Sequence, residues 1–148
     1  MTSEELTNLL RQEIPLCEFM KLEVTSLETQ SIITAAPLEP NRNMHGTGFA
    51  GALYSLAVAT GWSLVHNRLS LANADSLLVV KEATIHYRRP VTGDIELRSS
   101  FKNEMENEDL LIQLKTEGRV TFPLVITIFS KGKKCAYLEA DYIAVASK

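Results

Sequence analysis

The fold is decided by residues 41–69, which have the sequence NRNMHGTGFAGALYSLAVATGWSLVHNRL. A polar loop leads into a segment from about Phe49 to Leu69 that is apolar around nearly its whole circumference. A helix without a polar face must be surrounded by protein. Glycine inside a helix costs about 1 kcal/mol relative to alanine, so the glycines here indicate close approach of another backbone or side chain. Four of the seven glycines fall in this stretch: Gly46, Gly48, Gly51 and Gly61.

Before this helix, the chain predicts one short helix and two strands. Thr2 and Glu5 form a capping box, and leucines at helical spacing follow until Pro15, where we expect the helix to end. Met20 to Thr29 alternates between apolar and polar residues, and Ser31 to Leu38 is rich in small and β-branched residues. These two segments are predicted to pair as antiparallel strands.

After the helix, the chain predicts four strands interrupted by a small helix. A strand from Leu77 to Arg89 turns at 90–93 and resumes from 94 to 103, and two further strands cover 119–131 and 134–146. Leucines at helical spacing over Asn107–Glu117, with Gly118 as a stop, predict the small helix, and Asn107 is its expected cap. The order predicts an α+β fold in which a curved antiparallel sheet of five to six strands wraps around the long central helix.

Length and composition narrow the class of protein. A chain of 148 residues is about one domain, so a single domain over 1–148 is expected. A net charge of −3 argues against a nucleic-acid partner. Cys17 and Cys135 are far apart without nearby histidine clusters, so no metal site is predicted. The acidic start and the short apolar stretch predict neither export nor a membrane span, and a cytoplasmic location is expected.

The stretch from Asn41 to Ala57 resembles hot-dog thioesterases, and most closely the family named after the YiiD C-terminal domain. The segment YRRPVTGD, residues 87–94, resembles the matching strand and turn of that superfamily, and the strand beginning at Gly118-Arg119 extends the likeness over nearly the whole chain. The resemblance implies the hot-dog fold, a homodimer with a tetramer left open, and an acyl thioester substrate. It implies no cofactor beyond the phosphopantetheine of coenzyme A or of an acyl carrier protein.

The resemblance also implies a site. Related thioesterases have an Asn six residues before a His-Gly-Gly that opens the central helix, and an Asp nine residues after that His. In this chain the Asn corresponds to Asn43, the His-Gly-Gly to Phe49-Ala50-Gly51, and the Asp to Val58. Hydrolysis needs a carboxylate to activate water or attack the thioester, and valine supplies none. The backbone amides of Ala50 and Gly51, with the Asn43 carboxamide, are expected to stabilise an oxyanion.

Decarboxylation of a malonyl thioester needs only those parts, and malonyl-acyl-carrier-protein decarboxylation is an activity that the resemblance implies. This lyase reaction, which forms acetyl-carrier protein to prime fatty acid synthesis, is the leading hypothesis. The alternatives are a thioesterase that takes its acid from elsewhere, such as Glu82 of a partner subunit, and a noncatalytic acyl-thioester binding module.

Other residues are weaker candidates for contact with substrate. Asn41 is the functional amide if the loop is registered two residues earlier. His45 and Gly46 in the loop, and Phe49 and Val58 on the helix, are also candidates, and the alternative for His45 is a hydrogen bond within the loop. Arg88 and Arg89 are candidates for contacts with the pantetheine phosphate or with acidic groups of a carrier protein. Paired arginines at a strand end are also common on solvated surfaces, and both interpretations stay open.

Overall fold

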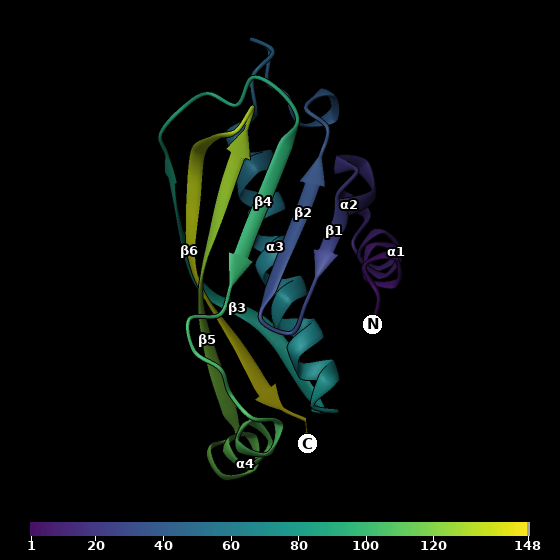
Figure 1. Cartoon of the computed structure of the whole chain (residues 1–148), viewed down its shortest axis with the longest axis vertical. Helices are drawn as coiled ribbons and strands as arrows, with labels where there is room; N and C mark the ends of the chain where they lie inside the picture. The colour runs from purple at the N-terminus through teal and green to yellow at the C-terminus, as the bar shows by residue number, and fades with distance from the viewer. Residues whose placement is uncertain (148) are drawn as a thin grey trace.

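A long helix, α3 (Ala50–Leu71), lies along one face of a curved antiparallel sheet in the computed structural model, which describes residues 1–147 (Figure 1). The sheet has six strands in the order β1-β2-β4-β5-β6-β3, and every neighbouring pair is antiparallel. This arrangement confirms the expected hot-dog fold. The strands are β1 (Glu23–Leu27), β2 (Ser31–Ala36), β3 (Ser76–Tyr87), β4 (Ile95–Ser100), β5 (Arg119–Ser130) and β6 (Lys133–Ala146).

The middle of α3 is fixed to the sheet by close packing and by buried hydroxyl groups. A Cβ added to Gly61 would lie 2.2 Å from the Tyr142 hydroxyl, which confirms that a neighbouring group approaches the helix closely at this glycine. That hydroxyl donates a hydrogen bond of 2.8 Å to the carbonyl of Val58. The hydroxyls of Thr34 on β2 and Thr60 on α3 form a second buried bond of 2.7 Å. These contacts fix the rotation of the helix about its own axis and its position on the sheet.

One side of α3 is less covered than the sequence predicted. Gly51 and Tyr54 are exposed, and Val58, Trp62 and His66 are only partly buried. These residues recur every three or four positions, so they form one stripe along the helix. The expectation of a helix covered around its whole circumference was wrong for this stripe, because a single curved sheet covers one side of a helix and leaves the opposite side open.

The N-terminal region contains two helices where one was predicted. The capping box of Thr2 and Glu5 starts α1 (Ser3–Glu13), as expected. Pro15, however, begins a second helix, α2 (Pro15–Met20), which ends at Lys21 in the left-handed conformation. Proline suits the first position of a helix, where its missing N–H has no partner to lose. The strand predicted from Met20 therefore starts only at Glu23.

The sheet narrows beyond the end of β4, which is shorter at both ends than predicted. Its pairing with β5 ends at Ser99 and Ile126, while β5 continues back to Arg119 alongside β6. Pro123 lies in this part of β5.

Helix α4 (Asn107–Glu117) has the predicted bounds, and Gly118 ends it with a φ of 79°. Its cap is Glu106 rather than Asn107, whose side chain instead accepts a hydrogen bond from Arg68.

Strand β3 is an edge strand of the sheet and pairs only with β6. Two large apolar side chains of this edge strand, Leu77 and Val79, are exposed.

Within residues 1–147, no helix combines the length and the apolar character needed to cross a membrane.

Candidate active site at the start of the central helix

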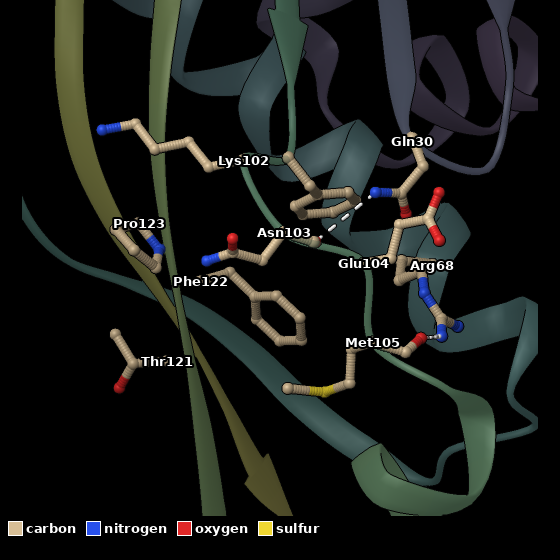
Figure 2. A pocket seen from close by; sticks show the side chains of 10 residues that line it. Gln30, Arg68, Lys102, Asn103, Glu104, Met105, Thr121, Phe122 and Pro123 are labelled. Carbon is tan, nitrogen blue, oxygen red and sulfur yellow. Dashed lines mark hydrogen bonds between the residues drawn. The ribbon is translucent and has the colours of Figure 1, made fainter.

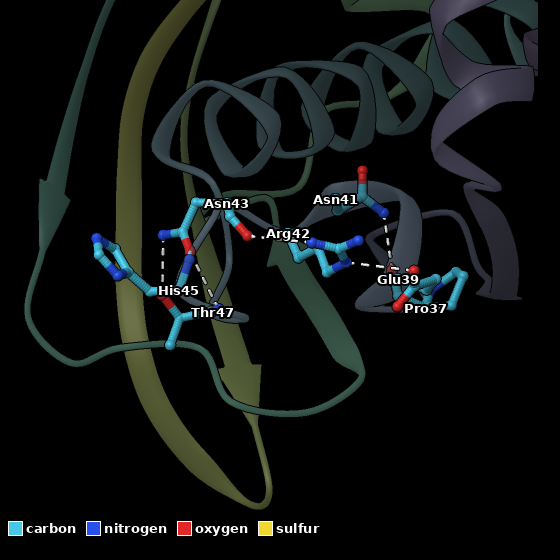
Figure 3. A network of polar contacts seen from close by, with 7 residues as sticks. All are labelled: Pro37, Glu39, Asn41, Arg42, Asn43, His45 and Thr47. Atoms are coloured by element: carbon cyan, nitrogen blue, oxygen red, sulfur yellow. Dashed lines mark hydrogen bonds and ion pairs between the residues drawn. The ribbon is translucent and has the colours of Figure 1, made fainter.

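The loop before α3 is closed by the side chain of Asn43. Its carboxamide oxygen accepts hydrogen bonds from the backbone N–H groups of His45 and Thr47, at 2.9 and 3.2 Å. Its amide nitrogen donates to the Thr47 hydroxyl at 2.9 Å, and its backbone N–H donates to the Thr47 carbonyl at 2.7 Å (Figure 3). Asn43 thus holds the loop in one conformation, a role that asparagine often has in turns.

This geometry limits what Asn43 can offer a substrate. Its oxygen is fully used within the loop, and its nitrogen has one hydrogen committed to Thr47. The second hydrogen has no acceptor within residues 1–147. The side chain is half-buried. A single N–H donor is therefore what the Asn43 side chain has left for a ligand.

Asn41 is bound differently. Its side chain is only 1% exposed, and its nitrogen donates to the carbonyls of Met20 and Pro37 at 3.0 and 2.8 Å. Both N–H groups are therefore used, one at the end of α2 and one just after the end of β2. Of the two asparagines that the sequence left open, only Asn43 keeps a donor hydrogen.

The first turn of α3 presents backbone donors without partners. The first hydrogen bond of the helix runs from the N–H of Leu53 to the carbonyl of Phe49, at 2.9 Å. Phe49 provides no side-chain cap, so the N–H groups of Ala50, Gly51 and Ala52 have no acceptor within the described residues. These amides lie at the positive end of the helix dipole, which favours negative charge. The helix start therefore has the free donors that stabilisation of an oxyanion requires, and the catalytic role of Ala50 and Gly51 stays a prediction.

Aromatic side chains surround this helix start. The ring of Phe49, which is 53% exposed, lies against Gly51, where an added Cβ would be 2.8 Å from it. Tyr87, the last residue of β3, donates its hydroxyl to the carbonyl of Ala50 at 2.7 Å. Burial, with a smaller contribution from Tyr54, raises the pKa of Tyr87. Sequence reasoning did not assign Tyr87 a role, because no local pattern shows that the end of β3 reaches the start of α3.

Carboxylates are missing from the segments that form this region. Residues 43–54 and 87–93 contain no Asp or Glu. Val58 is half-buried, and its carbonyl accepts the bond from Tyr142. Glu82, the alternative acid, lines a hollow with Glu139 and Asp141. Glu139 is exposed between the buried Leu138 and Ala140, so this hollow lies on the sheet face opposite α3.

The remaining candidates lie near the same end of the molecule. His45 is exposed in the loop, and Gly46 has a φ of 78°, a conformation that favours glycine. Arg88 and Arg89 directly follow β3 and are exposed. His45 and Gly46 thus lie in the loop before α3, and Arg88 and Arg89 lie just after the end of β3. Within residues 1–147 there is no group of three or more His, Cys, Asp or Glu that could hold a metal ion.

A separate cavity of about 170 Å³ lies near the other end of α3 (Figure 2). Phe101, Phe122 and Met105 supply its apolar lining. Arg68 of α3 is only 4% exposed there, and it donates to the Asn107 side chain at 2.7 Å and to the Met105 carbonyl. These bonds tie α3 to the segment before α4. Sequence reasoning missed this cavity, because its walls come from four separate segments.

Comparison with known proteins agrees with this description. The fold is that of thioesterase-type hot-dog proteins. Residues 3–146 match the model of a family described as "Putative thioesterase (yiiD_Cterm)", and the chain belongs to this family.

Three solved structures illustrate the likeness. The first, described as a "putative thioesterase" from Shewanella oneidensis, is 30% identical with a TM-score of 0.86, over 97% of this chain and 96% of that one. A protein of unknown function from Chlorobaculum tepidum is 27% identical with a TM-score of 0.89, over 98% and 94%. The PaaI protein of the E. coli phenylacetic acid degradation operon, at 12% identity and a TM-score of 0.73, shares the fold.

Proposed function

We propose that this protein is an acyl-thioester enzyme that decarboxylates a malonyl thioester, with the start of α3 as its oxyanion site. The observation that carries the proposal is the set of unpartnered amides at Ala50, Gly51 and Ala52, in a region built from segments without a carboxylate. Membership of the thioesterase-type family supports the thioester part of the proposal. The choice of decarboxylation over hydrolysis rests on the chemistry of the residues present.

Decarboxylation makes modest demands on the protein. The bond between the α-carbon and the carboxylate carbon breaks, carbon dioxide leaves, and the electron pair forms an enolate whose negative charge lies mainly on the thioester oxygen. Donors preorganised around that oxygen stabilise the transition state more than the ground state. A proton from water then converts the enolate into the acetyl thioester. No step needs a protein acid, which agrees with valine at position 58.

Hydrolysis is the second candidate, and it is favoured by the description of the family. It requires a carboxylate to activate water or to form an acyl intermediate. Glu82 lies on the sheet face opposite α3, so its placement does not favour this role.

We propose that the protein works as a homodimer. The edge strand β3 has twelve residues and only one neighbour, and its exposed Leu77 and Val79 are apolar. Unpaired edge strands readily add another strand. Pairing of two β3 strands would extend the sheet, and a second subunit would cover the open stripe of α3 around Val58 and Trp62. Each site would then lie beside the subunit boundary.

A product assay with malonyl-carrier protein and malonyl-CoA tests the proposed reaction. Decarboxylation gives the acetyl thioester and carbon dioxide, hydrolysis gives a free thiol, and a binding module gives neither. We expect Asn43→Ala to lower turnover by about 100-fold or more, the typical cost of one oxyanion donor, while the dimer measured by sedimentation stays intact.

Asn43→Asp is the matched variant, because aspartate keeps the oxygen that accepts from His45 and Thr47, its second oxygen can accept from the Thr47 hydroxyl, and it has no N–H donor. We expect it to be as inactive as Asn43→Ala while keeping wild-type thermal stability. If Asn43→Asp turns over at the wild-type rate, Asn43 only organises the loop. If the wild-type protein releases free thiol without acetyl product, the decarboxylase proposal is wrong.

A further inference from the structure

Positive charge is concentrated in a shallow hollow at the end of β3. Its lining consists of five residues: Arg88, Arg89, Lys133, Lys134 and Tyr137. All four cationic side chains are exposed, and the lining contains no carboxylate. The whole chain, by contrast, has a net charge of −3. Four like charges around one hollow repel one another, so an anion bound there would be stabilised.

The backbone fixes the arginines in this hollow. The N–H groups of Arg88 and Arg89 both donate to the carbonyl of Cys135, at 2.8 and 2.9 Å. The two arginines are therefore held beside Lys133 and Lys134, the first residues of β6. The cluster follows from the pairing of β3 with β6 and is not a chance approach of flexible side chains.

Tyr137 forms the floor of the hollow and holds two of the cations. The ammonium nitrogen of Lys134 lies 4.7 Å from the centre of the tyrosine ring, and the guanidinium carbon of Arg88 lies 5.6 Å from it. A nitrogen of Arg88 also donates to the Tyr137 hydroxyl at 3.3 Å. Such cation–π contacts orient the charges without neutralising them.

The cations of the hollow have no ionic partner within residues 1–147. Within these residues Arg42 pairs with Glu39 and Arg98 with Glu96, and His86 is hydrogen-bonded to Glu139, a contact that is ionic only when the imidazole is protonated. Glu139 lies two residues after Tyr137, but its carboxylate is bound by His86 at 2.9 Å. The hollow therefore has donors for an anion and no internal anion to occupy them.

The hollow is next to the proposed oxyanion site along the chain. Tyr87 contacts the first residue of α3 through its bond to the Ala50 carbonyl, and Arg88 is the following residue. Successive side chains of a strand point to opposite faces of a sheet. The end of β3 therefore separates the helix start on the inner face from the hollow on the outer face, and a long flexible substrate arm crossing this end would reach both.

We propose that the hollow binds the phosphate group of a phosphopantetheine thioester. Two guanidinium groups and two ammonium groups supply hydrogen-bond donors and positive charge for a phosphate, and a concave site of five residues suits one such group better than a broad acidic protein surface. Coenzyme A and acyl carrier proteins both carry this phosphate. The inference rests on the proposed function for its choice of ligand, and it gives Lys133, Lys134 and Tyr137 a role that the sequence did not assign them.

Direct binding tests this proposal without requiring turnover. Calorimetry would compare 4′-phosphopantetheine with pantetheine, which lacks only the phosphate. We expect the wild-type protein to bind the phosphorylated compound about tenfold or more tightly. The double variant Lys133→Gln/Lys134→Gln should lose this preference. The control Lys102→Gln/Lys115→Gln removes the same charge from exposed positions outside both the hollow and β3, and it should keep the preference. Equal affinities of the wild-type protein for the two compounds would overturn the proposal.

Kinetics with two substrates distinguish the sources of the phosphate. The Lys133→Gln/Lys134→Gln variant should raise KM for the CoA thioester and for the carrier-protein thioester by similar factors. If KM rises only for the carrier-protein thioester, the hollow binds an acidic surface of the carrier protein. If KM rises only for the CoA thioester, the hollow binds the nucleotide part of CoA. Either result overturns the proposal. Phosphate-dependent binding without turnover of any thioester would instead contradict the proposed function and leave this inference standing.

Discussion

The two ends of α3 differ in how their polar groups are used. At the first turn, the amides of Ala50 and Gly51 have no partners, and Phe49 is exposed. Towards the other end, Arg68 is buried and ties the helix to the segment before α4 through the Met105 carbonyl and the Asn107 side chain. The contacts that hold the helix to the fold therefore lie in its middle and at its far end, and the proposed function assigns the solvent-exposed donors of the first turn to a ligand.

The largest expected effect comes from comparing two glycines of this helix. Gly61→Ala places a Cβ against the Tyr142 hydroxyl in a packed interior, so we expect a loss of about 1–3 kcal/mol in the free energy of unfolding. Gly51→Ala meets only the exposed ring of Phe49, which is free to swing away, so its stability should change by less than about 0.5 kcal/mol. Urea denaturation of both variants measures the difference. Equal losses would remove the distinction between the first turn and the packed middle of the helix.

A smaller effect is expected at the buried hydroxyl pair of Thr34 and Thr60. Thr34→Val leaves the Thr60 hydroxyl bound to the carbonyl of Leu56, at 2.8 Å, and should cost less than Thr60→Val. Thr60→Val strands the Thr34 hydroxyl without a partner, which typically costs about 1–3 kcal/mol. The double variant should recover part of that loss, and a double-mutant cycle in urea measures it. Purely additive losses would show that the bond does not hold the helix to the sheet.

The smallest expected effect concerns pH. Burial lowers the pKa of His66, which stacks on Trp62 in the second half of α3, below its ordinary value of 6.5. The folded state therefore binds this proton less readily than the unfolded state, so His66 contributes stability above pH 6.5 that is lost as the pH falls through the lowered pKa. We expect His66→Gln to reduce the acid sensitivity of the urea midpoint. An unchanged slope below pH 6.5 would contradict the assignment.

Much of the fold could be predicted because its signals are local. The capping box at Thr2 fixed the start of α1, and the leucine spacing with Gly118 fixed the bounds of α4. Pro15 was misjudged because proline ends one helix and suits the first position of another equally well. Which outcome occurs depends on how far apart the segments before and after the proline lie in the folded protein. Tertiary packing sets that distance, and the local sequence does not show it.

The site was predictable only in part. The polar loop and the apolar helix located the helix start, and the resemblance singled out Asn43. The bond from Tyr87 to Ala50 and the grouping of Lys134 with Arg88 depend on the pairing of β3 with β6 and on the curvature of the sheet. No spacing along the chain encodes these contacts. A turn-forming Asn43 was one interpretation of the polar loop, but its particular bonds could not be predicted, because an asparagine that closes its own turn and one that faces a ligand have the same sequence.

Pro123 has a consequence for how the sheet can grow. It lies in the part of β5 that β4 does not reach, where a row of backbone donors would otherwise be open to a foreign strand. Proline has no N–H, so it interrupts that row and discourages strand addition there. The flank of β5 beyond the end of β4 is thereby protected against unwanted polymerisation, whereas the dimer proposed above would use the edge strand β3.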